Sequence, residues 1–236
     1  MATIRPLGVN GLYPTENSPS SGYLYKSGDK ALLIDLGSGV FTALSSLMDP
    51  ALLDGIILTH FHHDHCSDLG VLSYYLQTKG KRLKLYVPSP KDTHMSWISH
   101  CPYFDVTVID DGQKLSINGL SADFYFMNHP VSAYGVRIDD GKSIFSYTGD
   151  TNLCDNLDKL LSGANVALMD SAFLLSDWSP KKPHLSAHHC GLLSKKHGAK
   201  LLLTHLNPTK DKSLYLEEAR TFTDNVEVAC YKDYLI

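Results

Sequence analysis

Histidine and aspartate side chains are concentrated in one short segment of the chain. His60, His62, Asp64 and His65 fall within six positions, directly after the apolar run at residues 56–58. Imidazole and carboxylate groups are ligands that Zn²⁺ and similar divalent cations prefer in proteins. Four such groups in a tight loop between a buried strand and a helix face one small volume, which favours a metal site over a solvated polar loop.

Three further candidate ligands, His129, Asp150 and His205, each stand where an apolar run ends. A ligand directly after a buried strand is held rigidly at the carboxyl edge of its sheet, where other strand ends also meet. Alone, each position is typical of a cap or a turn. Together with the first segment they form one coherent set, and we expect all seven side chains to converge.

The composition indicates a globular protein. Of the 236 residues, 43% are hydrophobic and 19% are charged, which excludes a disordered or fibrous chain. No apolar run approaches the roughly 20 residues that cross a bilayer, and the first residues show no secretory signal, so no membrane partner is expected. The five cysteines are scattered without a Cys-x-x-Cys pair, which favours reduced thiols and a cytoplasmic location.

The charge balance argues against a long nucleic acid as partner. The chain has 25 acidic and 21 basic residues, for a net charge of −4, whereas a protein that grips a nucleic-acid backbone usually needs a strong positive field.

Hydrophobic periodicity predicts strands and helices that alternate along the chain. The strands are expected at residues 23–25, 31–35, 56–58, 83–87, 165–169, 200–204 and 226–229. The helices are expected at residues 40–48, 66–78, 90–99, 186–197 and 213–222. Residues 106–147 are expected to form an antiparallel meander, with turns at 110–112, 118–119 and 139–141.

No internal repeat or linker divides the chain, so we expect one domain over residues 1–236. Sheets with helices outside them form either a four-layer sandwich or a doubly wound α/β fold, and periodicity does not choose between these.

The histidine and aspartate pattern resembles that of the metallo-β-lactamase fold, and more narrowly its ribonuclease Z-type branch. The matching positions are His60-x-His62-x-Asp64-His65 followed by His129, Asp150 and His205. Residues 7–15, 146–151 and 184–187 resemble the opening strand and loop, the Gly-Asp-Thr turn and the His-x-Ser/Thr motif of that branch. The resemblance spans residues 4–229 and implies a four-layer αββα sandwich of the metallo-β-lactamase type.

The resemblance also implies two divalent metal ions, with Zn²⁺ the first choice and Mn²⁺ the second. The residues that would hold them are His60, His62 and His129 for the first ion, Asp64, His65 and His205 for the second, and Asp150 as the bridge between them. No cysteine occupies a ligand position, unlike in true lactamases, which argues against antibiotic hydrolysis and for phosphate chemistry.

The implied mechanism is that of a metal-dependent phosphodiesterase. Two metals about 3.5–4 Å apart can share a hydroxide that attacks phosphorus in line. Asp64 would orient or deprotonate this nucleophile. His184, expected at the start of a helix, is the candidate acid for the leaving group or the candidate stabiliser of a phosphate oxygen. Asp35, at a strand end, is expected to brace a ligand histidine.

The spacing of the ligands bears on the substrate. The tRNA 3′-processing nucleases of this branch usually carry a long arm between the third histidine ligand and the bridging aspartate. Here His129 and Asp150 are only 21 positions apart, which leaves room for one hairpin. Small members without the arm include the anti-Pycsar phosphodiesterases, which evade immunity by destroying cyclic nucleotides. The resemblance therefore favours 3′,5′-cyclic nucleotides (cCMP, cUMP, cAMP, cGMP), a homodimer and the cytoplasm, which is that of the host if the chain is phage-encoded.

Three other functions remain open. One is a tRNA 3′ endonuclease with a reduced arm. Another is a thioester hydrolase of the glyoxalase type, which should have a C-terminal helical segment that this chain has little room for after residue 226. The last is a non-catalytic metal sensor, although such relatives usually lose ligands.

Overall fold

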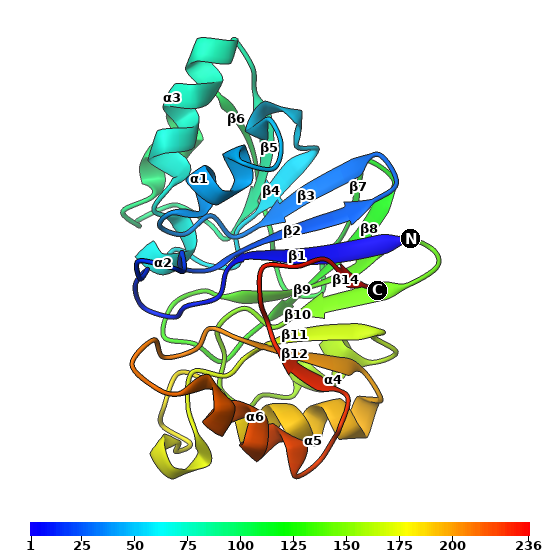
Figure 1. Cartoon of the computed structure of the whole chain (residues 1–236). Helices are drawn as coiled ribbons and strands as arrows, with labels where there is room; N and C mark the ends of the chain where they lie inside the picture. The colour runs from blue at the N-terminus through cyan, green and yellow to red at the C-terminus, as the bar shows by residue number, and fades with distance from the viewer.

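The computed structural model describes all residues from 1 to 236. Two seven-stranded mixed sheets pack face to face, and helices cover both outer faces, so the layers run helix, sheet, sheet, helix (Figure 1). This is the four-layer αββα sandwich, and the doubly wound alternative is excluded.

The two sheets have similar layouts, with antiparallel strands at one side and parallel strands at the other. In order across the first sheet, the strands are β14 (Tyr234–Leu235), β1 (Ala2–Gly8), β2 (Gly22–Ser27), β3 (Lys30–Ile34), β4 (Gly55–Ile57), β5 (Leu83–Val87) and β6 (Phe104–Val108). In order across the second sheet, they are β13 (Val226–Val228), β12 (Lys200–Thr204), β11 (Val166–Asp170), β10 (Ile144–Tyr147), β9 (Tyr134–Asp139), β8 (Leu120–Phe126) and β7 (Lys114–Ile117).

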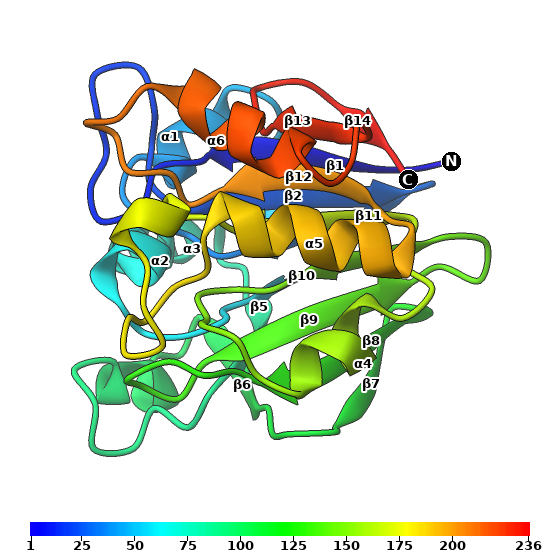
Figure 2. The same ribbon diagram turned by 90° about the horizontal axis from the view of Figure 1, so that it is seen from below.

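Three helices belong to each half of the chain. Those of the first half are α1 (Val40–Ser45), α2 (His63–Cys66) and α3 (Leu69–Lys79), and those of the second are α4 (Asn156–Leu161), α5 (Ala187–His197) and α6 (Lys212–Arg220). Figure 2 shows α4, α5 and α6 lying over the second sheet. Short 3₁₀ turns occur at Pro50–Leu52, Ser96–His100 and Leu175–Asp177.

The buried apolar side chains form one cluster for each contact between layers. The cluster between the sheets has 24 residues and contains large aromatic side chains such as Tyr23, Tyr25 and Phe145. A second cluster lies between the first sheet and α1 and α3, and a third between the second sheet and α4 to α6. The central parallel strands are therefore buried on both faces, which explains why their sequences are continuous apolar runs instead of alternating ones.

Two expectations about local structure are wrong. Residues 90–99 do not form a helix, because Asp92 has a left-handed backbone (φ 61°) and Thr93 bonds to the Pro90 carbonyl and the Met95 amide, which favours turns. The segment 104–108 is not part of the meander: it is the parallel strand β6 of the first sheet, and the turn at 110–112 carries the chain across to the second sheet. The sequence analysis also did not predict α4 or β14.

The strands bring the predicted site residues to one edge. The ends of β3 and β4 in the first sheet meet the ends of β8, β10, β11 and β12 in the second. Five of these strands are followed, within three residues, by a histidine or an aspartate, and β11 itself ends on Asp170. Because the sheets are buried, their strand ends hold these side chains in fixed positions.

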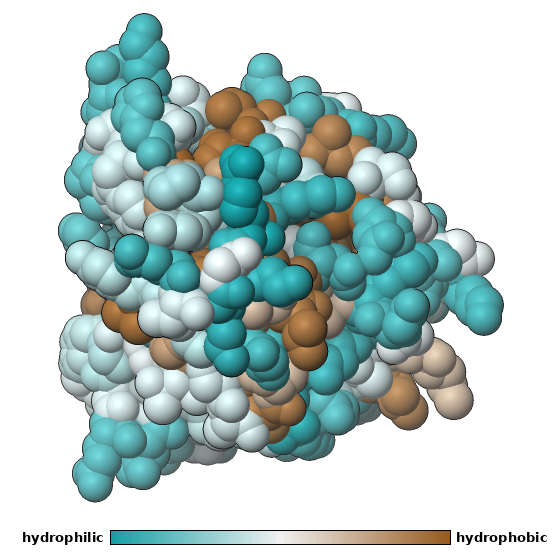
Figure 3. Space-filling model, turned by 90° about the horizontal axis from the view of Figure 1, so that it is seen from above, coloured by the Kyte–Doolittle hydropathy of each residue, from teal (hydrophilic) through white to brown (hydrophobic).

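The outer surface carries small hydrophobic patches separated by hydrophilic side chains (Figure 3). On α3, Val71 and Tyr74 are exposed. Patches of this kind are usual on protein surfaces, so the homodimer stays a prediction. No helix has both the length and the apolar character needed to cross a bilayer.

Two helical glycines give a test of the packing between layers. A Cβ at Gly191 of α5 would lie 2.6 Å from the backbone oxygen of Ala219 in α6, whereas a Cβ at Gly70 of α3 would meet nothing within 4 Å. We expect Gly191→Ala to lower the free energy of unfolding by about 1–3 kcal/mol through overpacking. We expect Gly70→Ala to raise it by about 0.4–1 kcal/mol. Urea unfolding of both variants checks this, and equal effects would contradict the described contact between α5 and α6.

Candidate metal centre

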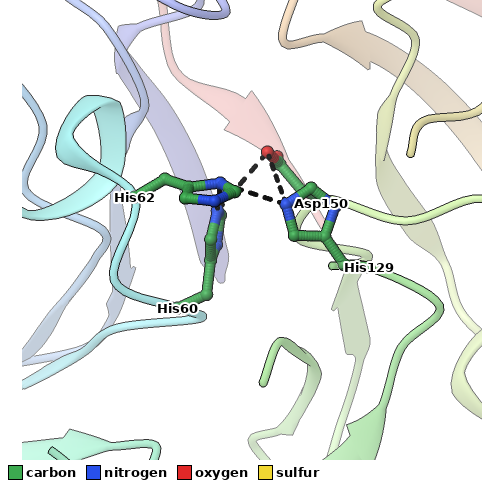
Figure 4. Close-up of side chains that lie close together, drawn as sticks. All are labelled: His60, His62, His129 and Asp150. Carbon is green, nitrogen blue, oxygen red and sulfur yellow. Dashed lines mark hydrogen bonds and ion pairs between the residues drawn. The ribbon is translucent and has the colours of Figure 1, made fainter. Parts of the chain in front are cut away.

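The first ligand cluster contains three imidazoles and one carboxylate that face one another (Figure 4). His62 Nδ1 lies 3.1 Å from both His60 Nε2 and His129 Nε2. Asp150 Oδ2 lies 3.5 Å from His60 Nε2 and 3.9 Å from His129 Nε2. His60 and His62 come from the loop after β4, His129 follows β8, and Asp150 follows β10. Loops from both sheets therefore build this cluster.

The second cluster contains Asp64, His65 and His205 together with the same Asp150. His205 Nε2 lies 3.1 Å from Asp64 Oδ2 and 3.3 Å from Asp150 Oδ2. His65 Nε2 lies 3.2 Å from Asp150 Oδ1. Asp150 thus belongs to both clusters, which is the position expected for a bridging ligand. The structure brings all seven predicted ligands together, and their binding of metal stays a prediction.

The hydrogen bonds of the ring nitrogens indicate where the lone pairs point. His129 Nδ1 donates to the Pro183 carbonyl. His60 Nδ1 donates to Thr59 Oγ1, whose hydroxyl is itself a donor to Asp35. The other nitrogen of each neutral ring, Nε2, therefore carries a lone pair directed at the centre of the first cluster.

The donor atoms in this arrangement fit divalent cations. Burial lowers the pKa of His62 and of His129 to about 4, so both rings are neutral at pH 7. His65 Nε2 and Asp150 Oδ1 are buried without any hydrogen bond, although buried polar atoms normally have partners. Nitrogens bound to a tetrahedral zinc lie about 3.3 Å apart, close to the 3.1 Å found here. The residues present therefore suit the metal ions that the sequence predicts.

Asp64 is an ionised carboxylate at the edge of the second cluster. Burial raises its pKa, but the hydrogen bond from His205 and the charges of His65 and His205 outweigh burial and hold the pKa well below its usual range. The backbone amide of Leu12 also donates to Asp64 Oδ2, at 2.9 Å. The carboxylate is therefore fixed from two sides.

Asp35 braces the site from behind, as expected. It accepts hydrogen bonds from the amide and hydroxyl of Thr59, from Tyr147 and, at 2.7 Å, from His65 Nδ1. The charges of Asp150 and Asp35 outweigh the effect of burial and raise the pKa of His65 well above its usual value. Asp35 therefore fixes the orientation of His65 and increases its affinity for a positive charge.

His184 lies beside the second cluster, in contact with a residue that the sequence analysis missed. Its Nδ1 donates to Asp170 Oδ2 at 2.8 Å, and Asp170 also accepts from the amide of Thr151. Burial lowers the pKa of His184, but the charges of Asp170 and Asp150 outweigh burial and raise it to about 9. Asp170 ends β11 as Asp150 follows β10, and that shared pattern was a signal that could have identified it.

His184 is not at the start of a helix, which corrects the prediction. Helix α5 begins at Ala187, and Ser186 is its N-cap, accepting from the amide of His189. His184 lies in the preceding loop, so any effect of the α5 dipole on it is weak. His63, outside the predicted ligand set, is exposed and packs on the ring of His94.

The family of the chain follows from this fold and this arrangement of ligands. Residues 31–206 match the family described as Beta-lactamase superfamily domain, and the chain belongs to that family. It is a metal-dependent hydrolase with the metallo-β-lactamase fold.

Its relatives extend over almost the whole chain. The probable metallo-hydrolase YhfI of Bacillus subtilis (strain 168) is 29% identical over 94% of this chain and 95% of that protein. An uncharacterised protein of Mycobacterium tuberculosis (strain ATCC 25618 / H37Rv) is 33% identical over 94% of this chain and 86% of that protein. Ribonuclease Z of Salinispora arenicola (strain CNS-205) is 23% identical over 94% of this chain and 92% of that protein.

Solved structures support the same fold. The crystal structure of YhfI from Bacillus subtilis has a TM-score of 0.92 and 28% identity, covering 99% of this chain and 98% of that one. A diphosphatase from the PhnP family has a TM-score of 0.75 at 19% identity, covering 97% of this chain and 94% of that one. The second likeness concerns the fold alone.

Removing the brace behind His65 tests the metal centre. We expect Asp35→Asn to weaken zinc binding by about 10- to 100-fold, because the partner that orients His65 and increases its basicity loses its charge. Competition with a chromophoric chelator measures this affinity. The control is Asp158→Asn, an exposed carboxylate that pairs with Lys196 and His197. Unchanged affinity in a folded Asp35→Asn variant would contradict the arrangement.

Proposed function

We propose that this hydrolase is a dinuclear phosphodiesterase that acts on a small phosphodiester, and that its substrates are 3′,5′-cyclic nucleotides (cCMP, cUMP, cAMP, cGMP). The observation that carries the proposal is that Asp150 is shared by two ligand clusters, with His184 next to both Asp150 and His205. Two adjacent cation sites and a proton-bearing group suit the displacement of an alcohol from phosphorus.

In this proposal His60, His62 and His129 would hold the first ion, Asp64, His65 and His205 would hold the second, and Asp150 would contribute to both sites. Zn²⁺ is our first choice because imidazoles dominate the ligands, and Mn²⁺ is the second. Two divalent ions at these sites supply an activated water near neutral pH and neutralise charge on the phosphate oxygens.

The surrounding residues divide the remaining tasks. Asp64, whose Oδ2 accepts from the Leu12 amide, would orient the attacking water. His184 has its Nδ1 bound to Asp170, which leaves Nε2 to hold the proton that the leaving oxygen takes. Asp170 is a positioning residue that keeps the ring of His184 in this orientation.

Three observations support a small substrate. The interval from His129 to Asp150 is filled by the hairpin of β9 and β10, so it contains no arm. The cavities beside the centre are small: about 200 Å³ next to His184 and about 290 Å³ next to His62. The net charge of −4 does not favour a long polyanion.

The second candidate function is a tRNA 3′ endonuclease. The similarity to Ribonuclease Z over 94% of this chain favours it. The missing arm and the acidic balance of charges favour the cyclic nucleotide.

Our preferred proposal also includes a homodimer, a cytoplasmic location and an anti-Pycsar role. Light scattering of the purified protein tests the homodimer.

A substrate panel separates the two candidates. The metal-loaded protein is incubated with cCMP, cUMP, cAMP and cGMP and, in parallel, with a precursor tRNA. We expect the cyclic nucleotides to become linear monophosphates, detected by chromatography, and the tRNA to stay intact. Cleavage of the tRNA alone would replace our proposal with the second one.

The proton-bearing role of His184 has its own test. We expect His184→Ala to lower kcat by about 10²- to 10⁴-fold, the usual range for a general acid, while metal content by mass spectrometry stays at the wild-type level. The control is His197→Ala, which removes a histidine that pairs with exposed Asp158. Wild-type kcat in His184→Ala would exclude His184 as the acid.

A further inference from the structure

The loop after β1 carries a leucine in an unusual position at the edge of the metal centre. Leu12 has a left-handed backbone (φ 69°), and its side chain is 67% exposed. A left-handed backbone is unfavourable for leucine and unstrained for glycine. An exposed side chain adds little to the stability of the fold, so the fold itself does not account for leucine at this position.

The backbone of this loop contacts residues of the metal centre. The Leu12 amide donates to Asp64 Oδ2, and the preceding Gly11 has no room for a Cβ, which would lie 2.8 Å from the ring of His205. Glycine at position 12 would adopt the left-handed backbone without strain and would still offer its amide to Asp64. The leucine side chain is therefore not needed for either feature and is available to contact a ligand.

Leu12 lines a cavity of about 200 Å³ that also reaches the proposed catalytic residues. Phe173 and Pro183 are its other large apolar residues, and His184 and His205 connect it to the metal centre. Phe173 is half-buried and packs edge-on to His184, with ring centroids 5.7 Å apart. The volume is below the roughly 300 Å³ of a site for a drug-sized ligand, so it suits one flat ring system.

A polar side chain at the same cavity can recognise the edge of such a ring. Asn207 Oδ1 accepts two hydrogen bonds from Thr209, one from its amide and one from its hydroxyl. These contacts fix the orientation of the Asn207 amide, and its Nδ2 makes no hydrogen bond within the chain. Nδ2 is a donor, so it suits an acceptor atom on the ring.

We propose that this cavity is the nucleobase subsite, in which Leu12 and Phe173 enclose the base and Asn207 donates to an acceptor on its edge. The inference rests on the proposed function, because a phosphate at the metal centre places the rest of the nucleotide within reach of this cavity. It assigns base recognition to the loops at residues 12, 173 and 207. In this assignment, the cavity beside His62, which Lys91 and Thr93 line, has no role in base recognition.

The test compares a ligand that has a base with one that lacks it. Calorimetry measures binding of adenosine and cytidine 5′-monophosphates and of ribose 5-phosphate to the metal-loaded protein. Since a stacked base contributes about a 5- to 150-fold change in affinity, we expect at least one of the nucleotides to bind about 10-fold more tightly than ribose 5-phosphate. Leu12→Gly, which keeps the amide bond to Asp64, and Phe173→Ala should each reduce this preference, and Leu12→Met should retain it.

Controls separate base recognition from damage to the site. Metal content and the affinity for ribose 5-phosphate should stay at wild-type levels in the Leu12 and Phe173 variants, and Lys91→Ala should keep the full preference for nucleotides. Asn207→Asp keeps the acceptor for Thr209 but removes the donor, so it should also weaken nucleotide binding.

The two proposals can fail separately. Equal affinity of the wild type for ribose 5-phosphate and both nucleotides would overturn the subsite, as would a full preference in Leu12→Gly and Phe173→Ala. Turnover of the cyclic nucleotides, measured in parallel, decides whether the phosphodiesterase proposal still stands in that case.

Discussion

The structure depends on one electrostatic constraint: several buried nitrogen and oxygen atoms with lone pairs face the same small volume. Asp150 is nearly inaccessible to water, yet it is surrounded by five histidines and lies near a second carboxylate. Burying such groups is unfavourable unless positive charge compensates them. Without metal, that charge comes from protons on the histidines. Divalent ions would provide it more directly, which accounts for the gathering of these groups in one buried site.

The supporting contacts are arranged around this constraint. Asp35 and Asp170 each hold one histidine by its Nδ1, so that the other nitrogen faces the centre or the open side. The Leu12 amide does the same for one oxygen of Asp64. Each of these three contacts joins segments that are distant in sequence, and each fixes an orientation that a free side chain would lose.

Much of the fold and of the site could be predicted from the sequence. The parallel strands are short continuous apolar runs, and the candidate ligands stand immediately after them, so the convergence of His60, Asp150 and His205 could be expected from their positions at strand ends together with the motif at residues 60–65. The failures have physical causes. Residues 90–99 begin with a proline, which is typical of the first turn of a helix, but local hydrogen bonds of Thr93 and the backbone of Asp92 favour turns. The assignment of Phe104–Val108 depended on which sheet it joins, and only tertiary contacts determine that.

The division of the ligands between the sheets has a thermodynamic consequence. His60, His62, Asp64 and His65 extend from the first sheet, whereas His129, Asp150 and His205 extend from the second. An ion in either cluster would thus be a cross-link between the two halves of the sandwich. An ion that binds only the folded chain adds about 2.7 kcal/mol of stability when its free concentration is a hundred times its dissociation constant. Resistance to heat would therefore depend on the supply of metal, and a chelating buffer that emptied the centre would weaken the association of the two sheets.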